Sequence, residues 1–133
     1  MTLFDSLQAS SSGMSAQRLR MNLISKNLAN ANTTRTPEGG PYRRKEAHFA
    51  SKEEDGSFQN ILETQILEDN RPPVLKYDPQ HPDADRKGYV KMPNINVVEE
   101  MVNMISAARN FEANVTAVRT AKHMAARAID IGR

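Results

Sequence analysis

Four side chains that could bind a metal ion lie in one short stretch near the middle of the chain. They are Asp78, His81, Asp83 and Asp85. Counted from Asp83, the stretch has carboxylates at positions one and three and Gly88 at position six, as a calcium-binding loop does. The match then fails, because position five is Lys87 and position twelve is Asn94, where such a loop needs a bidentate Glu. Asp and Pro are also common in turns, so we expect a turn here and no metal site.

Residues of the types that most often perform catalysis are sparse and scattered. The chain has no Cys, and its three histidines, His48, His81 and His123, lie far apart in the sequence. No motif of a zinc protease, a phosphate-binding loop, a dinucleotide-binding loop or a nucleophile elbow occurs. We therefore expect no catalytic residue, no cofactor and no enzyme activity.

The basic run Arg43-Arg44-Lys45 could contact phosphate groups, but no aromatic platform accompanies it. Residues 1–50 carry seven Lys or Arg against three Asp or Glu, residues 51–100 six against eleven, and residues 101–133 five against two. Basic ends and an acidic middle favour association between copies over a single cationic face. We expect no nucleic-acid partner.

The last third of the chain predicts the longest element. Steps of four and three residues from Val97 trace a stripe that only Lys122 interrupts: Val97, Met101, Met104, Ala108, Phe111, Val115, Val118, Lys122, Ala125 and Ile129. Neither Gly nor Pro occurs in residues 97–131, and Asn96 with Glu99 has the spacing of an N-cap and its third helical residue. The pattern predicts a helix of about 33 residues, roughly 50 Å long, that packs along another helix.

The amino-terminal segment predicts a second helix over residues 3–31. Leu7, Met14, Met21 and Leu28 recur at intervals of seven, and Ile24 lies in the interleaved row. We predict that these residues pair with the carboxy-terminal stripe, from Met101 to Val118. Val98 and Ile105 widen that stripe, and Leu19 and Leu23 lie off the amino-terminal one, so apolar seams exist on more than one side. A hairpin of these two helices with no further packing remains an alternative.

The middle of the chain predicts a small β-containing insert. Residues 42–49 and 74–77 read as strands, 89–92 as extended chain, 50–57 as an exposed acidic loop, and 58–67 as a strand or a short helix. The expected fold class is therefore mainly α, with two long terminal helices in an antiparallel, coiled-coil-like hairpin around this insert. Its expected divisions are residues 1–34, 35–93 and 94–133, with an elbow at residues 27–33.

Two features bear on location. No run of about 18 apolar residues occurs, so we expect no membrane span. The amino end also lacks the basic and apolar regions of a secretory signal peptide, which by itself favours a cytoplasmic protein. A soluble homodimeric coiled-coil adaptor or regulator is the main alternative that these residues leave open.

Both ends of the chain carry motifs of a known family. Residues 27–33, Asn-Leu-Ala-Asn-Ala-Asn-Thr, resemble the NxANxxT signature near the amino end of bacterial flagellar rod and hook proteins. Residues 100–114 resemble the carboxy-terminal EMV-x-MI-x3-R-x-[YF]-x-AN helix of that family, with Phe111 where Tyr is commoner. Residues 41–44, 81–85 and 88–94 are similar to segments of its short, proximal-rod members, so the resemblance covers essentially the whole chain.

The resemblance implies a structural subunit of the proximal rod of the flagellar basal body, which carries motor torque to the hook. It implies helical assembly with copies of itself and with other rod proteins, export by the flagellar type III apparatus without a cleaved signal peptide, and a final place in the periplasm. Together with the stripes, it predicts an interface for subunit and helix packing. Its residues are Leu7, Met14, Met21, Ile24, Leu28, Asn27, Asn30, Asn32, Thr33, Met101, Met104, Ile105, Ala108, Phe111, Asn114, Val115 and Val118.

Overall fold

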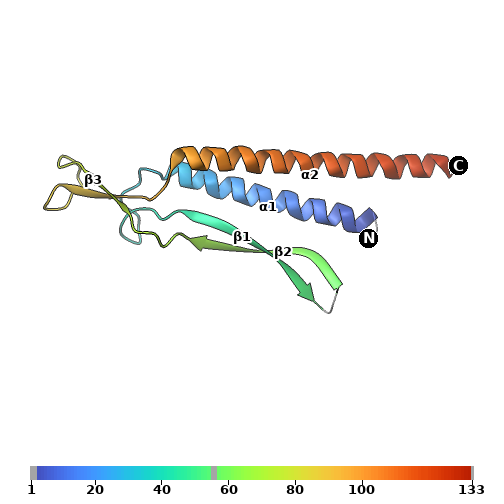
Figure 1. The fold of residues 1–133 in the computed structure, drawn as a ribbon, viewed down its shortest axis with the longest axis horizontal. Coiled ribbons are helices and arrows are strands. Elements are labelled where there is room, and N and C mark those ends of the chain that lie inside the picture. Colours follow the sequence, from blue (N-terminus) through green and yellow to red (C-terminus); the bar gives the residue numbers. More distant parts are fainter. Residues whose placement is uncertain (1–2, 55–56, 133) are drawn as a thin grey trace.

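Two long helices and two β-hairpins make up the described chain (Figure 1). The computed structural model describes residues 3–54 and 57–132, with the side chains of residues 3 and 51–63 left out. Helix α1 spans Leu3–Ala29 and helix α2 spans Val97–Ile131, and the two lie side by side and antiparallel. Both chain ends therefore lie at the same end of the pair. The predicted fold class is confirmed.

The start of α2 follows from its sequence. Asn96 has extended backbone angles, and its side chain accepts hydrogen bonds from the backbone N–H groups of Val98 and Glu99, at 3.1 and 3.3 Å. These bonds satisfy two of the donors that a helix leaves unpaired at its first turn. The next 35 residues contain no helix breaker and continue to Ile131. The predicted N-cap is confirmed.

Both hairpins come from the middle of the chain. Strand β1, Lys45–Glu54, pairs antiparallel with β2, Ser57–Glu68, and strand β3, Val74–Tyr77, pairs antiparallel with β4, Tyr89–Met92. Residues 58–67, for which the sequence allowed either a strand or a short helix, are thus part of strand β2. The predicted acidic loop over residues 50–57 is wrong for residues 50–54 and 57, which belong to strands β1 and β2, while residues 55 and 56 lie outside the described chain. Charged residues suit a strand of a two-stranded hairpin, since such a hairpin needs little apolar surface.

The β1–β2 hairpin lies along α1 and, over its described residues, packs against α1 and not against α2, so that α1 lies between the hairpin and α2 in Figure 1. The packing of the hairpin on α1 changes the expected role of Leu23. Leu23, predicted to lie off the main stripe and to serve other contacts, is buried together with Ala47 of β1. The guanidinium of Arg20 also lies 5.2 Å from the centre of the Phe49 ring. This side of α1 is covered within the chain.

The residues of the apolar core are mostly small. They are Ala16, Leu23, Ile24, Ala47, Val90, Ala107 and Ala121, and the polar Asn27 and Glu100 are buried as well. On α2 the line of low exposure runs from Glu100 through Ala107 to Ala121, rotated from the predicted stripe. Val97, Met101 and Ile129 of that stripe are exposed. Two helices approach most closely where side chains are small, so alanines and not the larger residues face α1 here.

Candidate assembly surface

A buried polar cluster joins α1, α2 and the first strand at the elbow end of the helix pair. The side chains of Asn27 and Glu100 have 0% and 1% of their surface exposed. Nδ2 of Asn27 donates to Oε2 of Glu100 at 3.0 Å and to the backbone oxygen of Lys45 at 2.9 Å. Oδ1 of Asn27 accepts from the backbone N–H of Lys45 at 3.0 Å and from the hydroxyl of Tyr42 at 3.2 Å. One amide side chain thus holds both the partner helix and β1.

Arg44 completes this cluster. Its Nε donates to Oε1 of Glu100 at 2.7 Å, and its Nη1 donates to Oε2 of Glu46 at 2.9 Å. Burial acts to lower the pKa of Arg44, but its hydrogen bonds to the two carboxylates outweigh burial, and the pKa is raised. The guanidinium therefore stays charged opposite the buried carboxylate. We call Asn27, Arg44 and Glu100 the elbow cluster.

The rest of the elbow is held by short-range bonds. Nδ2 of Asn30 donates to the backbone oxygen of Lys26 at 2.8 Å, which satisfies a carbonyl at the end of α1. The hydroxyl of Thr33 donates to Oδ1 of Asn30 at 3.1 Å, and the backbone N–H of Tyr42 donates to the oxygen of Thr33 at 3.1 Å. Asn32 is exposed. The asparagine-rich segment therefore ends the helix and turns the chain back toward it.

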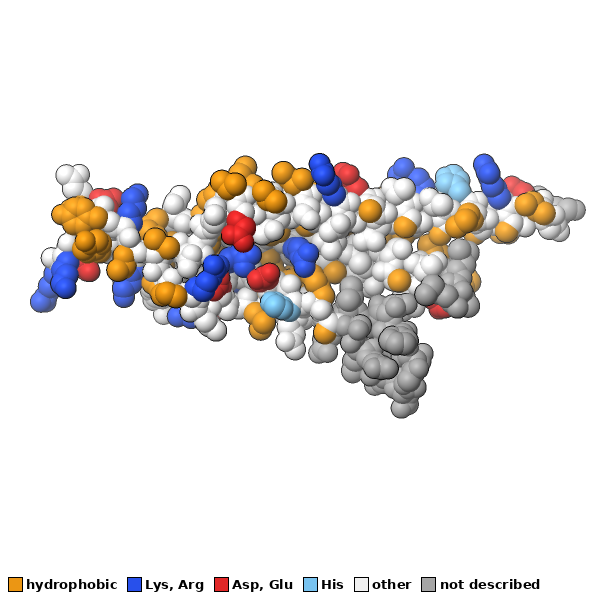
Figure 2. Space-filling view, in the orientation of Figure 1, with side chains coloured by type: hydrophobic (Ala, Val, Ile, Leu, Met, Phe, Trp, Pro, Cys, Tyr) orange, Lys and Arg blue, Asp and Glu red, His pale blue; other side chains and the backbone are white. Residues whose placement is uncertain are grey.

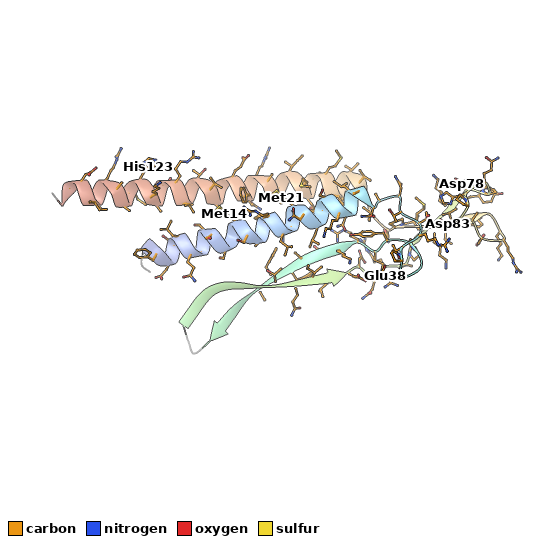
Figure 3. The ribbon with its side chains drawn as sticks, turned by 180° about the vertical axis from the view of Figure 1, so that it is seen from behind. Met14, Met21, Glu38, Asp78, Asp83 and His123 are labelled. Carbon is orange, nitrogen blue, oxygen red and sulfur yellow. The ribbon has the colours of Figure 1, made fainter. Side chains whose placement is uncertain are left out.

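The predicted interface residues fall into three groups. Ile24 and Asn27 are buried. Asn32, Met101 and Ile105 are exposed. The remaining residues are half-buried, and they are Leu7, Met14, Met21, Leu28, Asn30, Thr33, Met104, Ala108, Phe111, Asn114, Val115 and Val118. Figure 3 shows Met14 and Met21 along α1 beside α2.

The outer side of the first half of α2 carries a continuous apolar face. Val98, Met101, Val102 and Ile105 have 69%, 55%, 60% and 56% of their surface exposed. They are neighbours at spacings of three and four residues, so their side chains form one patch. Figure 2 shows hydrophobic side chains gathered along this edge of the molecule. We call these four residues the outer α2 face.

Beyond the elbow, β3 and β4 form a ribbon that contacts no other helix or strand among the described elements. The rings of Tyr77 and Tyr89 meet edge to face at 5.3 Å between centroids. Gly88 has a φ of +83°, and a Cβ there would lie 2.9 Å from the Tyr77 ring, so only glycine fits. The hydroxyl of Thr34 donates to Oδ2 of Asp83 at 2.7 Å, which ties the ribbon to the elbow.

The polar stretch from Asp78 to Asp85 lies in the turn that joins β3 to β4. Oδ1 of Asp85 accepts from the backbone N–H groups of Lys87 and Tyr89, at 2.8 and 2.9 Å, and these bonds lower its pKa. Nδ1 of His81 accepts from the backbone N–H of Asp83. Figure 3 shows Asp78 and Asp83 far from His123. Within the described chain, no three His, Asp or Glu side chains converge as metal ligands.

Known proteins match the chain along its length. The family described as "Flagella basal body rod protein" matches residues 7–35, and "Flagellar basal body rod FlgEFG protein C-terminal" matches residues 86–131. The flagellar basal-body rod protein FlgC of Borreliella burgdorferi is 46% identical over 93% of each chain. Those of Bacillus subtilis and Escherichia coli are 43% and 39% identical over the full length of both chains. The chain belongs to the FlgC family.

Membership in the FlgC family makes the chain a structural rod subunit of the flagellar basal body. The two matched segments are the two ends of the fold: one holds most of α1 and the elbow, the other holds β4 and α2. Asn27 lies in the first and Glu100 in the second, so the elbow cluster is where the two FlgC segments meet. No helix of the described chain is both long and apolar enough to cross a membrane.

Sequence reasoning missed three features of the FlgC helix pair. Arg44 was assigned to a basic run and to a family-like segment, and Glu100 to a family motif, but neither was expected to form an ion pair. Gly13 was given no role in packing, yet a Cβ there would lie 3.0 Å from Nδ2 of Asn114, so its lack of a side chain lets α2 approach. One signal was available. The steps from Glu100 through Ala107 and Asn114 to Ala121 repeat every seven residues, as the predicted stripe does.

Proposed function

We propose that this chain builds the proximal part of the rod by packing its outer α2 face against helices of neighbouring copies and of other rod proteins. The observation that carries the proposal is that patch: four neighbouring apolar side chains, more than half exposed, on a helix whose other side already pairs with α1. Fully burying a Val, Ile or Met side chain stabilises by about 1.5–3 kcal/mol. Covering four would favour association by several kcal/mol.

The arrangement suits an open, helical assembly. The exposed side of α1 is mostly polar, with Ser11, Arg18 and Asn22 on it, whereas the outer α2 face groups four exposed apolar side chains. A patch that meets a different surface on the next subunit gives a contact that does not close on itself. Torque would pass from subunit to subunit through such contacts to the hook, and the elbow cluster would keep each subunit from shearing internally.

We also propose that the chain reaches the periplasmic part of the basal body through the flagellar type III export apparatus, without a cleaved signal peptide. Membership in the FlgC family supports this route. Mass spectrometry of purified basal bodies would then find the amino-terminal peptide of the chain intact. A rod-bound chain that lacks its first 15–30 residues, as signal cleavage would leave it, would refute the proposed route.

Val102→Asp tests the proposed interface. A charge in the middle of the outer α2 face should prevent its burial against a neighbour while the α1–α2 pair stays folded, because Val102 points away from α1. We expect no rods and no swimming in cells whose own copy is deleted, with near-normal amounts of the exported chain. Asn110→Asp is the matched control, since Asn110 is an exposed polar residue on another side of α2. Normal swimming with Val102→Asp would disprove the assignment.

A further inference from the structure

Two contacts between α1 and α2 define the same axial alignment. Asn27 meets Glu100, and Gly13 meets Asn114. Gly13 and Asn27 are fourteen residues apart on one helix, and Glu100 and Asn114 are fourteen apart on the other. The residue numbers of each pair therefore add to 127, and the spacing is two heptads of a coiled coil. We propose that the polar contact between Asn27 and Glu100, and not the apolar seam, selects the register in which the helices pair.

The apolar seam alone cannot select it. In the observed register, Leu23 is level with Met104 and Ala16 with Phe111. A shift of one heptad along α2 would set Leu23 level with Phe111 and Ala16 with Val118. Both of these α1 residues would still be level with an apolar residue of α2, so their hydrophobic contribution to pairing would change little.

The unequal lengths of the helices make that shift possible. Helix α1 has 27 residues and α2 has 35. In the observed register, residues 3–29 of α1 are level with residues 98–124 of α2, and residues 125–131 extend past the start of α1. A one-heptad shift would set α1 level with residues 105–131, so every turn of α1 would still lie beside α2. A shift in the opposite direction would leave the last turns of α1 without a partner.

The elbow cluster penalises the shift. Moved by one heptad, Asn27 would be level with Ala107, and Glu100 would be level with residue 34, beyond the end of α1. Asn27 would lose its bond to Glu100, and Glu100 would lose both Asn27 and Arg44. A buried polar group left without its partner shifts an equilibrium by about tenfold or more. A buried polar pair of this kind is the best-attested device for fixing coiled-coil register.

The proposed assembly gives the register a consequence, and this one step rests on the proposed function. The hairpin is held by α1 through Asn27 and Lys45, whereas the outer α2 face lies on α2. A slip of one heptad would move the face about 10 Å along the subunit relative to the hairpin. Subunits in mixed registers could not repeat the same contacts along a rod.

Paired cysteines in the full chain test the register directly, because the natural sequence contains none. The pair Ser6→Cys and Ala121→Cys is level in the observed register, and the pair Ser6→Cys and Ala128→Cys is level only after a one-heptad slip. In the observed register, the second pair is about 10 Å apart along the axis, beyond the Cα separation that a disulfide spans. The yield of each disulfide under mild oxidation therefore reports the population of each register.

We expect the first disulfide to exceed the second by at least about tenfold in the otherwise natural chain. Glu100→Leu should narrow that ratio about tenfold while leaving the bonds between Asn27 and Lys45 in place. Glu99→Leu, the same change at an exposed neighbour, should leave the ratio as it was. If Glu100→Leu fails to fold, as judged by circular dichroism, Glu100→Gln keeps the side-chain shape and should narrow the ratio about threefold.

If Glu100 merely stabilised the fold, its substitution would lower the unfolding midpoint without changing the ratio of the two disulfide yields. Equal yields of the two disulfides in the natural background, or a ratio unchanged by the substitutions of Glu100, would overturn the proposal. These measurements concern the chain itself. They stand or fall independently of whether Val102→Asp blocks rod assembly.

Discussion

The two ends of the helix pair are built in opposite ways. At the elbow end, polar side chains are buried: Asn27, Glu100 and Arg44 join two helices and a strand. At the end that carries both termini, apolar side chains are exposed. Phe4, Ile129 and Ile131 have 79%, 68% and 86% of their surface exposed. A globular protein would place these residue types the other way round.

The difference separates two tasks. Directional bonds at the elbow end are lost if the helices shift, so this end specifies how the chain pairs with itself. The terminal end, like the outer α2 face, offers apolar surface without a fixed partner among the described residues, which suits contacts made after assembly. Substitutions in the elbow cluster should therefore change different properties from substitutions of these exposed apolar residues.

Asn27→Ala should have the largest effect on stability. It removes the bonds to Glu100, to both backbone groups of Lys45 and to Tyr42, and it leaves a buried carboxylate oxygen with fewer donors. We expect a loss on the order of 3 kcal/mol in the free energy of unfolding, measured by urea titration with circular dichroism.

Ile129→Ala is the matched substitution at the terminal end. It removes a larger apolar side chain, but one that is mostly exposed and beyond the start of α1, so the free energy of unfolding should change by less than about 0.5 kcal/mol. If the two variants were equally destabilised, the contrast between the ends would be false.

Gly13→Ala should change the free energy of unfolding less than Asn27→Ala does, and the size of the change should depend on Asn114. Alanine favours a helix over glycine by about 1 kcal/mol, but its Cβ would press on Asn114. We expect little net change in the natural chain and a gain of about 1 kcal/mol when Asn114→Ala is also present. A double-mutant cycle on the unfolding free energy measures this coupling. A coupling energy near zero would mean that the close approach of Gly13 to Asn114 does not affect the stability of the helix pair.

The smallest effect is a pH dependence at the ribbon beyond the elbow. The pKa of Asp85 is lowered, chiefly by the N–H of Tyr89, so the stability from these bonds is fully present above the ordinary carboxyl pKa of about 4. It is lost as the pH falls through the lowered value in the folded chain. The amide resonance of Tyr89 should shift in that acidic range and not in Asp85→Asn. A Tyr89 resonance that titrates alike in both chains would remove Asp85 as its cause.

Much of the architecture could be predicted from the sequence because its signals are local. An uninterrupted period of three and four residues from Val97, with a cap at Asn96, specifies α2 almost to the residue. Turn residues separate the strands β3 and β4 in the same way. The extent of β1 could not be found, because its second half carries charges that also suit a loop and is held by pairing with β2, a contact distant in sequence.

The contacts of the helix seam were harder to predict for a physical reason. Periodicity shows that a helix has a stripe of residues facing its partner, but two neighbouring rows of residues on α2 fit the same period equally well. Ranking rows by apolar size favours Val97 and Met101, but close helix packing selects Ala107 and Ala121. The elbow cluster was beyond local reasoning altogether, since Asn27, Arg44 and Glu100 are brought together only by the fold.

A density map of the assembled rod at side-chain resolution tests the central claim most directly. The account predicts that each subunit of this chain keeps Asn27 bonded to its own Glu100, with Val98, Met101, Val102 and Ile105 buried against a neighbouring subunit. A map in which the outer α2 face meets solvent, or in which the two helices of one subunit pair in another register, would contradict it.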